Sequence, residues 1–319
     1  MDRRSVLGSM VAGMGVMAAA PAWAQGAAAP GDVPHWSAPV IDMHFHMRRD
    51  PAANVAHQQG AGVTAACLLT RTGAEEEIHA LQAANPGMFP CYMVGYDVTK
   101  PDAEQVLTAA VKAGARGIGE LKYHVAADGP EMRRIYDLCA EMGVPVMMHI
   151  QSFPHFAGEL PYNTGYPQFD KMLQAHPKTK FIGHGDLFWA HISADVPTDR
   201  GYPSGPIKPG GLTDRFLSDY SNLYADISAN SGNNALARDV DFSREFIVRH
   251  RAKLIFGSDC GCMDGKGSGI SQGRNPEAAR LAGQCVARAT LGLLKRTTSP
   301  EIFRQITWNN GQRMFQVNV

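Results

Sequence analysis

The stretch VIDMHFHMRRD, residues 40–50, places two histidines inside an otherwise apolar run. In a β-strand the side chains alternate with period two, so His44 and His46 are predicted to point to one face. Val40 and Asp42 are expected to share that face. The opposite face would carry Ile41, Met43, Phe45 and Met47. Two imidazoles on one face are the beginning of a metal site, although a pair of hydrogen-bonded core histidines is the alternative that this stretch leaves open.

Seven further short apolar runs follow along the chain, and helical patterns separate them. The runs are VTAACLL (63–69), FPCYMVGYD (89–97), GIGELKYH (117–124), VPVMMHI (144–150), KFIGHGD (180–186), NLYADIS (222–228) and KLIFGSD (253–259). The segment between 102 and 114 predicts a helix with Asp102 as its N-cap and Gly114 at its end. A last helical region covers 277–296 and 299–315. Eight strands with intervening helices predict a single-domain α/β protein, a (β/α)₈ TIM barrel. A doubly wound sheet is the alternative, but no glycine-rich phosphate turn follows the first run.

Residues 1–24 read as a signal peptide that precedes the folded domain. Arg3 and Arg4 come first, an apolar stretch follows, and Ala22-Trp23-Ala24 forms a small-x-small cleavage site. The arginine pair suggests the twin-arginine export pathway. We therefore expect a periplasmic protein without a membrane anchor after processing. Its parts are a tail over 25–37 and a barrel with C-terminal helices over 38–319.

Charge and cysteine usage limit the partners and the redox chemistry. Lys+Arg and Asp+Glu both total 30, so no net charge is available to bind nucleic acid or anionic lipid. A small-molecule substrate is expected, and homo-oligomer formation stays open. The six cysteines are predicted to be buried free thiols, although Cys67 and Cys91 lie in neighbouring predicted strands. Cys260 and Cys262 are predicted to be an incidental loop pair, with soft metal ligands as the alternative.

Polar residues close three of the later runs. His149 ends the fifth run, His184 lies near the end of the sixth, and Asp259 ends the eighth. The carboxyl ends of the strands carry the active site of a barrel enzyme. Each residue alone fits a structural role. Together with His44 and His46 they predict an active site at this end of the barrel.

This ordered set resembles the amidohydrolase superfamily, in particular the amidohydrolase 2 group of metal-dependent hydrolases and decarboxylases. The matching pieces are DMHFH (42–46), His149, GHGD (183–186), GSD (257–259) and the closing ITWNNGQRMF (306–315). The resemblance covers nearly all of the chain after the signal peptide, and it implies the barrel fold.

The resemblance also implies roles for these residues. His44, His46, His149 and Asp259 would be metal ligands, and His184 would bind a second ion or orient the water or the substrate carbonyl. A mixed nitrogen and oxygen ligand set suits a divalent metal, Zn²⁺ above all, with Mn²⁺ or another divalent ion as alternatives. Asp259 would be the general base toward a metal-activated water.

The number of ions, one or two, depends on the fourth run. Alternation puts Glu120 and Lys122 on one face, toward the barrel interior if Ile118 also points there. GELKYH resembles the GEIGLD segment of the deoxyribonuclease-like branch, in which a glutamate bridges two ions. A bridging Glu120 would leave one ion to His44, His46 and Asp259 and the other to His149 and His184. The alternative is a buried ion pair between Glu120 and Lys122 that needs no metal.

The long loops after the strands would supply the substrate pocket. Aromatic candidates for its lining are Phe153, His155, Phe156, Tyr162 and Trp189, and candidates for binding a carboxylate are Lys208 and Arg274. The expected function is metal-dependent hydrolysis of an amide, ester or lactone bond in a small molecule. The alternatives are non-oxidative decarboxylation or C–C hydrolysis of an aromatic acid, and a metal-retaining binding protein without turnover.

Overall fold

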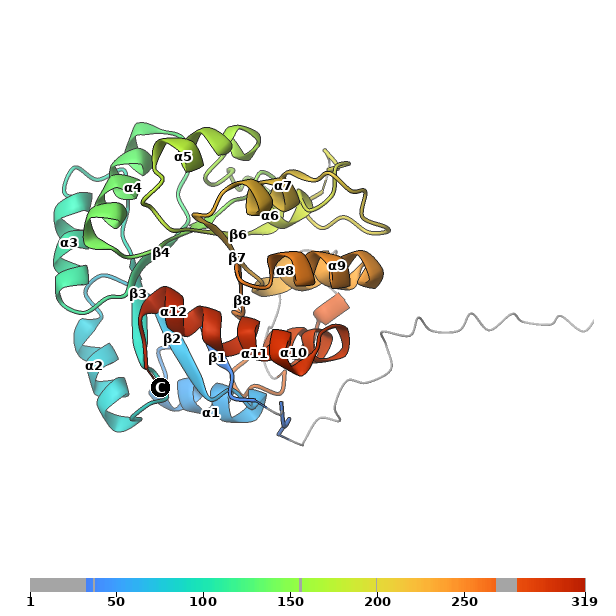
Figure 1. Ribbon diagram of the computed structural model, residues 1–319. Helices are drawn as coiled ribbons and strands as arrows, with labels where there is room; N and C mark the ends of the chain where they lie inside the picture. Colours follow the sequence, from blue (N-terminus) through green and yellow to red (C-terminus); the bar gives the residue numbers. More distant parts are fainter. Residues whose placement is uncertain (1–32, 37, 155–156, 199, 268–279, 319) are drawn as a thin grey trace, which may run out of the picture.

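Eight parallel strands form the centre of the computed structural model, which describes residues 33–36, 38–154, 157–198, 200–267 and 280–318 (Figure 1). Each strand is hydrogen-bonded to the next in chain order. Their bounds are β1 (Ile41–His46), β2 (Ala65–Arg71), β3 (Cys91–Gly95), β4 (Gly117–Leu121), β5 (Val146–His149), β6 (Phe181–His184), β7 (Leu223–Asp226) and β8 (Leu254–Ile255). The predicted signal peptide lies outside the described residues.

Strand β8 returns to β1 and brings the two ends of the sheet together. The backbone N–H of Met43 donates to the carbonyl of Phe256 at 3.0 Å, and the N–H of Asp259 donates to the carbonyl of His44 at 2.8 Å. A doubly wound sheet requires a point at which the strand order reverses, and the order β1 to β8 has none. The predicted (β/α)₈ barrel is therefore confirmed.

Helices surround the strands on the outside, and each of β1 to β4 is followed by one helix of six residues or more (Figure 1). Helix α3 begins directly after Asp102, but the Asp102 side chain makes no capping bond and accepts a hydrogen bond from the Tyr96 hydroxyl at 3.0 Å instead. The helix bounds are α1 (Pro51–Ala61), α2 (Glu75–Ala84), α3 (Ala103–Lys112), α4 (Pro130–Met142), α5 (Asp170–Ala175), α6 (Asp186–Ala190), α7 (Leu212–Asp219), α8 (Ala229–Ala237), α9 (Val240–His250), α10 (Val286–Thr297), α11 (Pro300–Arg304) and α12 (Asn310–Phe315). A 3₁₀ turn (Tyr166–Gln168) precedes α5, and a π-helical segment (Gln305–Asn309) joins α11 to α12.

Two apolar cores hold the barrel together. The larger one lies between the strands and the surrounding helices. The smaller one combines alternate strand residues with the C-terminal helical region, from which Trp308, Met314 and Phe315 contribute. Several strand residues in this smaller core, such as Ile41 and Cys91, are the first residues of their strands. The amino-terminal end of the barrel is thus filled with apolar side chains, and the polar residues are left at the carboxyl end.

Strand β1 does not keep the strict alternation that its sequence predicted. Val40 and Phe45 both belong to the outer core, whereas Ile41 and Met43 belong to the inner one. Phe45 lies five positions after Val40, so strict alternation would put them on opposite faces. The pairing of β1 with β2 shifts register between Asp42 and Phe45, as in a β-bulge. The predicted grouping of Val40 with the histidines is therefore wrong, because the extra residue of a bulge re-aims the side chains that follow.

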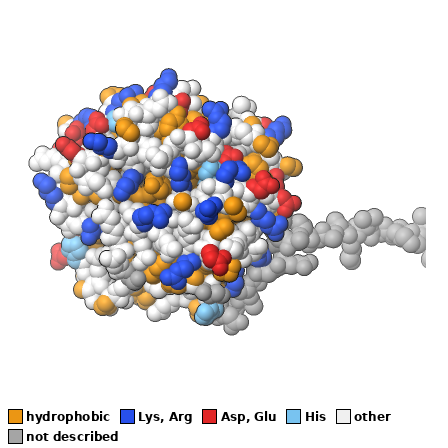
Figure 2. Space-filling view, in the orientation of Figure 1, with side chains coloured by type: hydrophobic (Ala, Val, Ile, Leu, Met, Phe, Trp, Pro, Cys, Tyr) orange, Lys and Arg blue, Asp and Glu red, His pale blue; other side chains and the backbone are white. Residues whose placement is uncertain are grey.

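All six cysteines are buried and free, as predicted. Cys67 and Cys91 are paired in register across β2 and β3. Positive and negative side chains both occur on the face shown in Figure 2, in keeping with the equal charge totals. Within the described ranges, no helix combines the length and apolar character needed to cross a bilayer.

Candidate active site

Histidines from β1 meet the aspartate that follows β8 at the carboxyl end of the barrel. The Nε2 atoms of His44 and His46 lie 3.3 Å apart. One oxygen of Asp259 is 3.4 Å from Nε2 of His46 and 3.7 Å from Nε2 of His44. His44 is completely buried, whereas the side chains of His46 and Asp259 are 51% and 27% exposed. Three donor atoms thus converge at the base of an accessible pocket, as a metal site with an open position requires.

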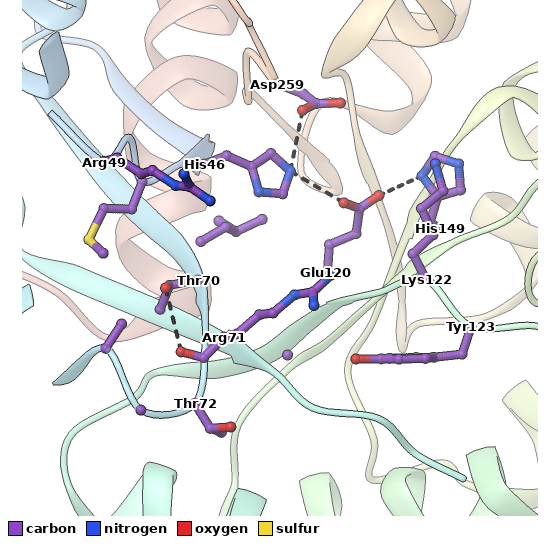
Figure 3. A pocket seen from close by; sticks show the side chains of 15 residues that line it. His46, Arg49, Thr70, Arg71, Thr72, Glu120, Lys122, Tyr123, His149 and Asp259 are labelled. Carbon is purple, nitrogen blue, oxygen red and sulfur yellow. Dashed lines mark hydrogen bonds and ion pairs between the residues drawn. The ribbon is translucent and has the colours of Figure 1, made fainter. Parts of the chain in front are cut away.

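Glu120 lies between His46 and His149 (Figure 3), and His184 faces the same carboxylate. Its Oε1 atom is 2.5 Å from Nδ1 of His149 and 3.5 Å from Nε2 of His184. Its Oε2 atom is 3.3 Å from Nε2 of His46. One carboxylate therefore faces both groups of donors, one group through each oxygen. The structure brings together all six residues that the sequence proposed for the metal site: His44, His46, Glu120, His149, His184 and Asp259.

A shift in strand pairing directs Glu120 into the barrel. The pairing of β4 with β5 changes register between Ile118 and Leu121, and both of these residues pack into the outer core. The expectation that Glu120 and Ile118 share a face is therefore wrong. The predicted alternative of an ion pair between Glu120 and Lys122 is not found among the described residues. Lys122 instead places its ammonium 4.8 Å from the centre of the Tyr162 ring.

Asp226 is a member of the site that sequence reasoning missed. Its Oδ2 atom lies 2.7 Å from Nδ1 of His44 and 3.2 Å from Nδ1 of His184, and it accepts a hydrogen bond from Ser228. Carboxylates in this position orient a metal-ligating histidine and fix its tautomer. The available signal was its place at the end of the seventh run, which matches the places of His149 and His184.

Gln151 orients the ring of His149 from the other side. The Nε2 atom of His149 lies 2.8 Å from the side-chain oxygen of Gln151, and the Gln151 amide nitrogen donates to Glu159 and to the Phe153 carbonyl. These two bonds fix the amide so that its oxygen faces the imidazole. With a cation bound, His149 would donate from Nε2 to Gln151 and leave the lone pair of Nδ1 for the cation.

The carboxylates give the site a negative electrostatic character. Burial lowers the pKa of His44, but Asp259, Asp226 and Glu120 outweigh burial and raise this pKa to about 10. Burial raises the pKa of Glu120, yet the facing imidazoles, His149 above all, hold it well below its ordinary value. Burial lowers the pKa of His149 and favours its neutral, ligating form. Three carboxylates among four histidines thus create a place for positive charge.

An unpartnered nitrogen supports the same interpretation. The Nε2 atom of His184 is buried and has no hydrogen-bond partner within the described residues. It points toward Glu120 and Asp259, at 3.5 and 3.8 Å from their oxygens. Buried polar atoms are rarely left without a partner, so a ligand between these groups would satisfy it. The donor set therefore fits a divalent cation.

A pocket of about 790 Å³ opens above the cluster. His46, Glu120, His149 and Asp259 are among its lining residues, so the metal-site donors face the space available to a substrate (Figure 3). Its other polar and charged lining residues are Arg49, Thr70, Arg71, Thr72, Lys122 and Tyr123. The volume suits a small molecule, and the three cationic side chains suit an anionic one.

The pocket residues expected from the sequence lie elsewhere or outside the described residues. Trp189 is buried against Phe188, and Lys208 pairs with Asp195 at 3.0 Å and is 69% exposed. Phe153 packs against the outer core. Tyr162 is adjacent to the pocket residue Lys122 but is not itself part of the lining. The predicted residues His155, Phe156 and Arg274 lie outside the described residues.

A barrel with clustered histidine and carboxylate donors at the carboxyl ends of its strands defines a metal-binding (β/α)₈ protein. The chain matches the amidohydrolase family over residues 37–317, and it belongs to this family. The resemblance seen in the sequence is therefore confirmed. A search of curated proteins found no match.

Solved structures share the fold at low sequence identity. A zinc-bound amidohydrolase from Burkholderia multivorans has a TM-score of 0.56 at 14% identity, over 88% of this chain and 100% of the other. The 5-carboxyvanillate decarboxylase from Sphingomonas paucimobilis has a TM-score of 0.54 at 11% identity, over 88% of this chain and 99% of the other. The dihydroorotase from Campylobacter jejuni has a TM-score of 0.52 at 16% identity, over 88% of this chain and 84% of the other. Together the family match and the donor clusters support a metal-dependent enzyme of the amidohydrolase superfamily, which contains both hydrolases and decarboxylases.

Proposed function

We propose that this protein is a metal-dependent hydrolase that cleaves an amide, ester or lactone bond in a small molecule bearing a carboxylate. The observation that carries the proposal is the position of Glu120. One of its oxygens faces His46 and the other faces His149, which divides the donors into two adjacent groups. Two neighbouring divalent ions bridged by a carboxylate are typical of enzymes that hydrolyse carbonyl compounds.

The two groups of donors would hold the ions as follows. His44, His46 and Asp259 form one group, and Glu120, His149 and His184 form the other; the second oxygen of Glu120, 3.3 Å from Nε2 of His46, would bridge to the first group. When bound, divalent ions would polarise the scissile carbonyl and make water more acidic. Zinc fits the nitrogen and oxygen donors, and manganese is the main alternative.

Asp259 is placed to move the proton. Its side chain is the more exposed of the two carboxylates that reach His46, and it lines the pocket. Its backbone φ of 44° lies in the left-handed region, which aspartate tolerates better than most residues. Within reach of a water in the pocket, the carboxylate would accept the water proton and pass it to the leaving group.

The cationic rim would hold and orient the substrate. Arg49, Arg71 and Lys122 come from three different segments and all line the pocket. A planar guanidinium binds a carboxylate through two parallel hydrogen bonds, so an arginine gives both affinity and orientation. Three cations in one pocket favour a substrate with one or more carboxylates.

A matched substrate panel tests this proposal. Each lactone, ester or amide is offered with a free carboxylate and with that carboxylate masked as its amide. We expect hydrolysis of the carboxylated member with kcat/KM at least tenfold higher, and we expect Arg71→Met to remove most of that preference. Hydrolysis without any preference for the carboxylate would contradict the assigned substrate class.

Decarboxylation of an aromatic acid is the second candidate, because the same cations and metal donors would also hold an aromatic carboxylate. Similar structures include decarboxylases of 5-carboxyvanillate and of 2,6-dihydroxybenzoate. Released CO₂ from an aromatic acid, with no cleavage of any lactone, ester or amide in the panel, would replace the hydrolase proposal with this one. Metal binding without turnover of either panel would favour a binding protein.

A further inference from the structure

Four buried side chains with soft or nitrogen donors gather outside the active site. Cys260 and Cys262 follow β8, Cys285 precedes α10, and His57 lies in α1. Each is at most 5% exposed, and their ligand atoms all lie within 4.8 Å of one another. The sequence predicted an incidental loop pair at Cys260 and Cys262. The structure instead places this pair beside a third cysteine and a histidine that are distant in the chain.

The spacing of these atoms suits a tetrahedrally coordinated ion. The sulfurs of Cys260 and Cys262 are 3.3 Å apart, those of Cys260 and Cys285 are 3.9 Å apart, and the Cys285 sulfur is 3.9 Å from Nε2 of His57. Around zinc, tetrahedral geometry with the usual bond lengths separates two sulfurs by about 3.8 Å and a sulfur from a nitrogen by about 3.6 Å. The three contacts lie within about 0.5 Å of these separations.

The surroundings of the His57 side chain suit a metal ligand. Its side chain is completely buried. The Nδ1 atom has no hydrogen-bond partner among the described residues, and Nε2 contacts the Cys285 sulfur. A buried imidazole in a protein normally makes hydrogen bonds or binds a metal. The position of Nε2 beside the three sulfurs favours the metal.

Hydrogen-bond donors surround the sulfurs, as they do in thiolate sites. The backbone N–H of Val286, the first residue of α10, donates to the Cys260 sulfur at 3.3 Å. Backbone N–H groups of Gly265 and Gly267 donate to Cys262. Donors of this kind orient and support the ligands of a metal site.

A partly buried cation lies beside the cluster. Arg48 donates to the carbonyl oxygens of Cys260 and Cys262 at 2.6 and 3.0 Å, and its guanidinium sits 3.9 Å from the centre of the Phe45 ring. Three thiolates, one neutral imidazole and one divalent cation carry a net charge of minus one, by the usual charges of these groups. The neighbouring guanidinium would offset that charge.

The loop that carries the cysteines is packed tightly on α1. A Cβ atom on Gly60 of α1 would meet the backbone oxygen of Asp264 at 1.8 Å, so only glycine permits this approach. Arg288 of α10 donates to the Gly60 carbonyl at 2.5 Å. The cluster therefore lies where three separate segments converge, which is where a structural ion has the most to stabilise.

We propose that Cys260, Cys262, Cys285 and His57 form a second, structural site for a thiophilic divalent ion, zinc above all. This ion would fix the loop that begins directly after Asp259 to helices α1 and α10. The inference does not rest on the proposed hydrolase function, because none of the four ligands belongs to the active-site cluster.

Cobalt substitution of the full-length protein tests the proposal. Tetrahedral thiolate-bound Co²⁺ absorbs in the near ultraviolet through sulfur-to-metal charge transfer, whereas the nitrogen and oxygen donors of the active site give no such band. We expect the band in the wild type. Cys262→Ser and Cys285→Ser should each weaken or abolish it and lower zinc content by about one ion per chain, by the ligand count of a closed structural site. Cys139→Ser, a buried cysteine in α4, is the matched control and should change neither.

Counting thiols distinguishes the outcomes that would overturn the proposal. In denaturant with chelator and no reductant, the metal site predicts that all six cysteines react with a thiol reagent. Six reactive thiols without a charge-transfer band in cobalt-loaded protein would mean buried thiols that bind no ion. Four reactive thiols, restored to six by reduction, together with no charge-transfer band, would mean a disulfide instead. The wild-type spectrum and thiol count decide the matter even if a cysteine variant fails to fold.

Discussion

The Oδ2 atom of Asp226 lies 2.7 Å from Nδ1 of His44, on the side of the ring that faces away from the metal-site donors. The same oxygen is 3.2 Å from Nδ1 of His184. One buried carboxylate thus orients a ligand from each of the two donor groups, and both Nε2 atoms are directed toward the place of the ions.

Asp226→Asn should weaken metal binding at the active site by about 10- to 100-fold, because the amide cannot stabilise both imidazoles. Competition with a chelator of known affinity measures the effect. Asp241→Asn, at a carboxylate that is 94% exposed, is the matched control and should bind metal like the wild type. Unchanged affinity in Asp226→Asn would show that the histidines are oriented without this carboxylate.

Asp259→Asn should lower the rate of the chemical step by about 10² or more, because the variant keeps the shape and loses the base. Metal content must be measured together with kcat, since Asp259 also faces His44 and His46. A variant with full metal content and nearly normal turnover would assign the base to another group.

Glu120→Gln should lower the metal content of the purified protein and its activity, because a neutral amide is a poor bridge between two cations. The thiolate band at the cysteine cluster should stay unchanged, which separates the two sites. Equal metal content in the variant and the wild type, with activity retained, would rule out the bridge.

Asp214 makes the free energy of unfolding depend on pH, so that the fold loses stability as the pH falls. Burial raises its pKa, but hydrogen bonds from His250 at 2.6 Å and from Arg249 outweigh burial and hold the pKa below its ordinary value. A lowered carboxyl pKa stabilises the folded state above the unfolded pKa of about 4, and this contribution is lost as the pH falls through the folded pKa. Asp214→Asn should therefore lower the free energy of unfolding at pH 7 by about 1–3 kcal/mol and flatten its decline below about pH 4. Denaturant titrations at several pH values measure both effects. A variant whose free energy of unfolding declines at acid pH as steeply as that of the wild type would contradict the assignment.

Gly257 allows β8 to approach the site closely. A Cβ atom there would meet an Asp226 oxygen and the Cβ of His44, both at 2.5 Å. Gly257→Ala should cost about 1–3 kcal/mol of stability and weaken metal binding, because overpacking displaces the site. Gly292→Ala, within α10 and near only a flexible arginine side chain, is the contrasting control and should stabilise the protein by about 0.5–1 kcal/mol. Chemical denaturation of both variants tests the pair.

The sequence predicted the barrel and most of the metal-site donors because strand ends and apolar runs are local features. His149, His184 and Asp259 each close a recognisable strand, so their convergence followed from the fold. Asp226 closed a strand in the same way, but no matching piece of the family resemblance drew attention to it. The local shifts in β1 and β4 arise from pairing with neighbouring strands, which no single run encodes.

The pocket was predicted less well than the metal donors. Arg49 follows β1 and Arg71 ends β2, both without a motif. The loops that were expected to line the pocket lie to its side or outside the described residues. His57 gave no signal either, because its partners belong to segments far away in the chain. Contacts between distant segments depend on how loops pack, and composition does not determine that packing.

The hydrogen bond from Asp259 to His44 has a consequence for the order of events during synthesis. It joins the first strand of the barrel to the residues that follow the last one, and donors of one metal group come from both. A nascent chain in which only β1 to β7 have been synthesised therefore lacks Asp259 and cannot complete that group of ligands. Such long-range closure is slow and comes late in folding. Metal uptake by that group should consequently follow synthesis of β8 and Asp259, and chains truncated before Asp259 should be unable to retain its ion.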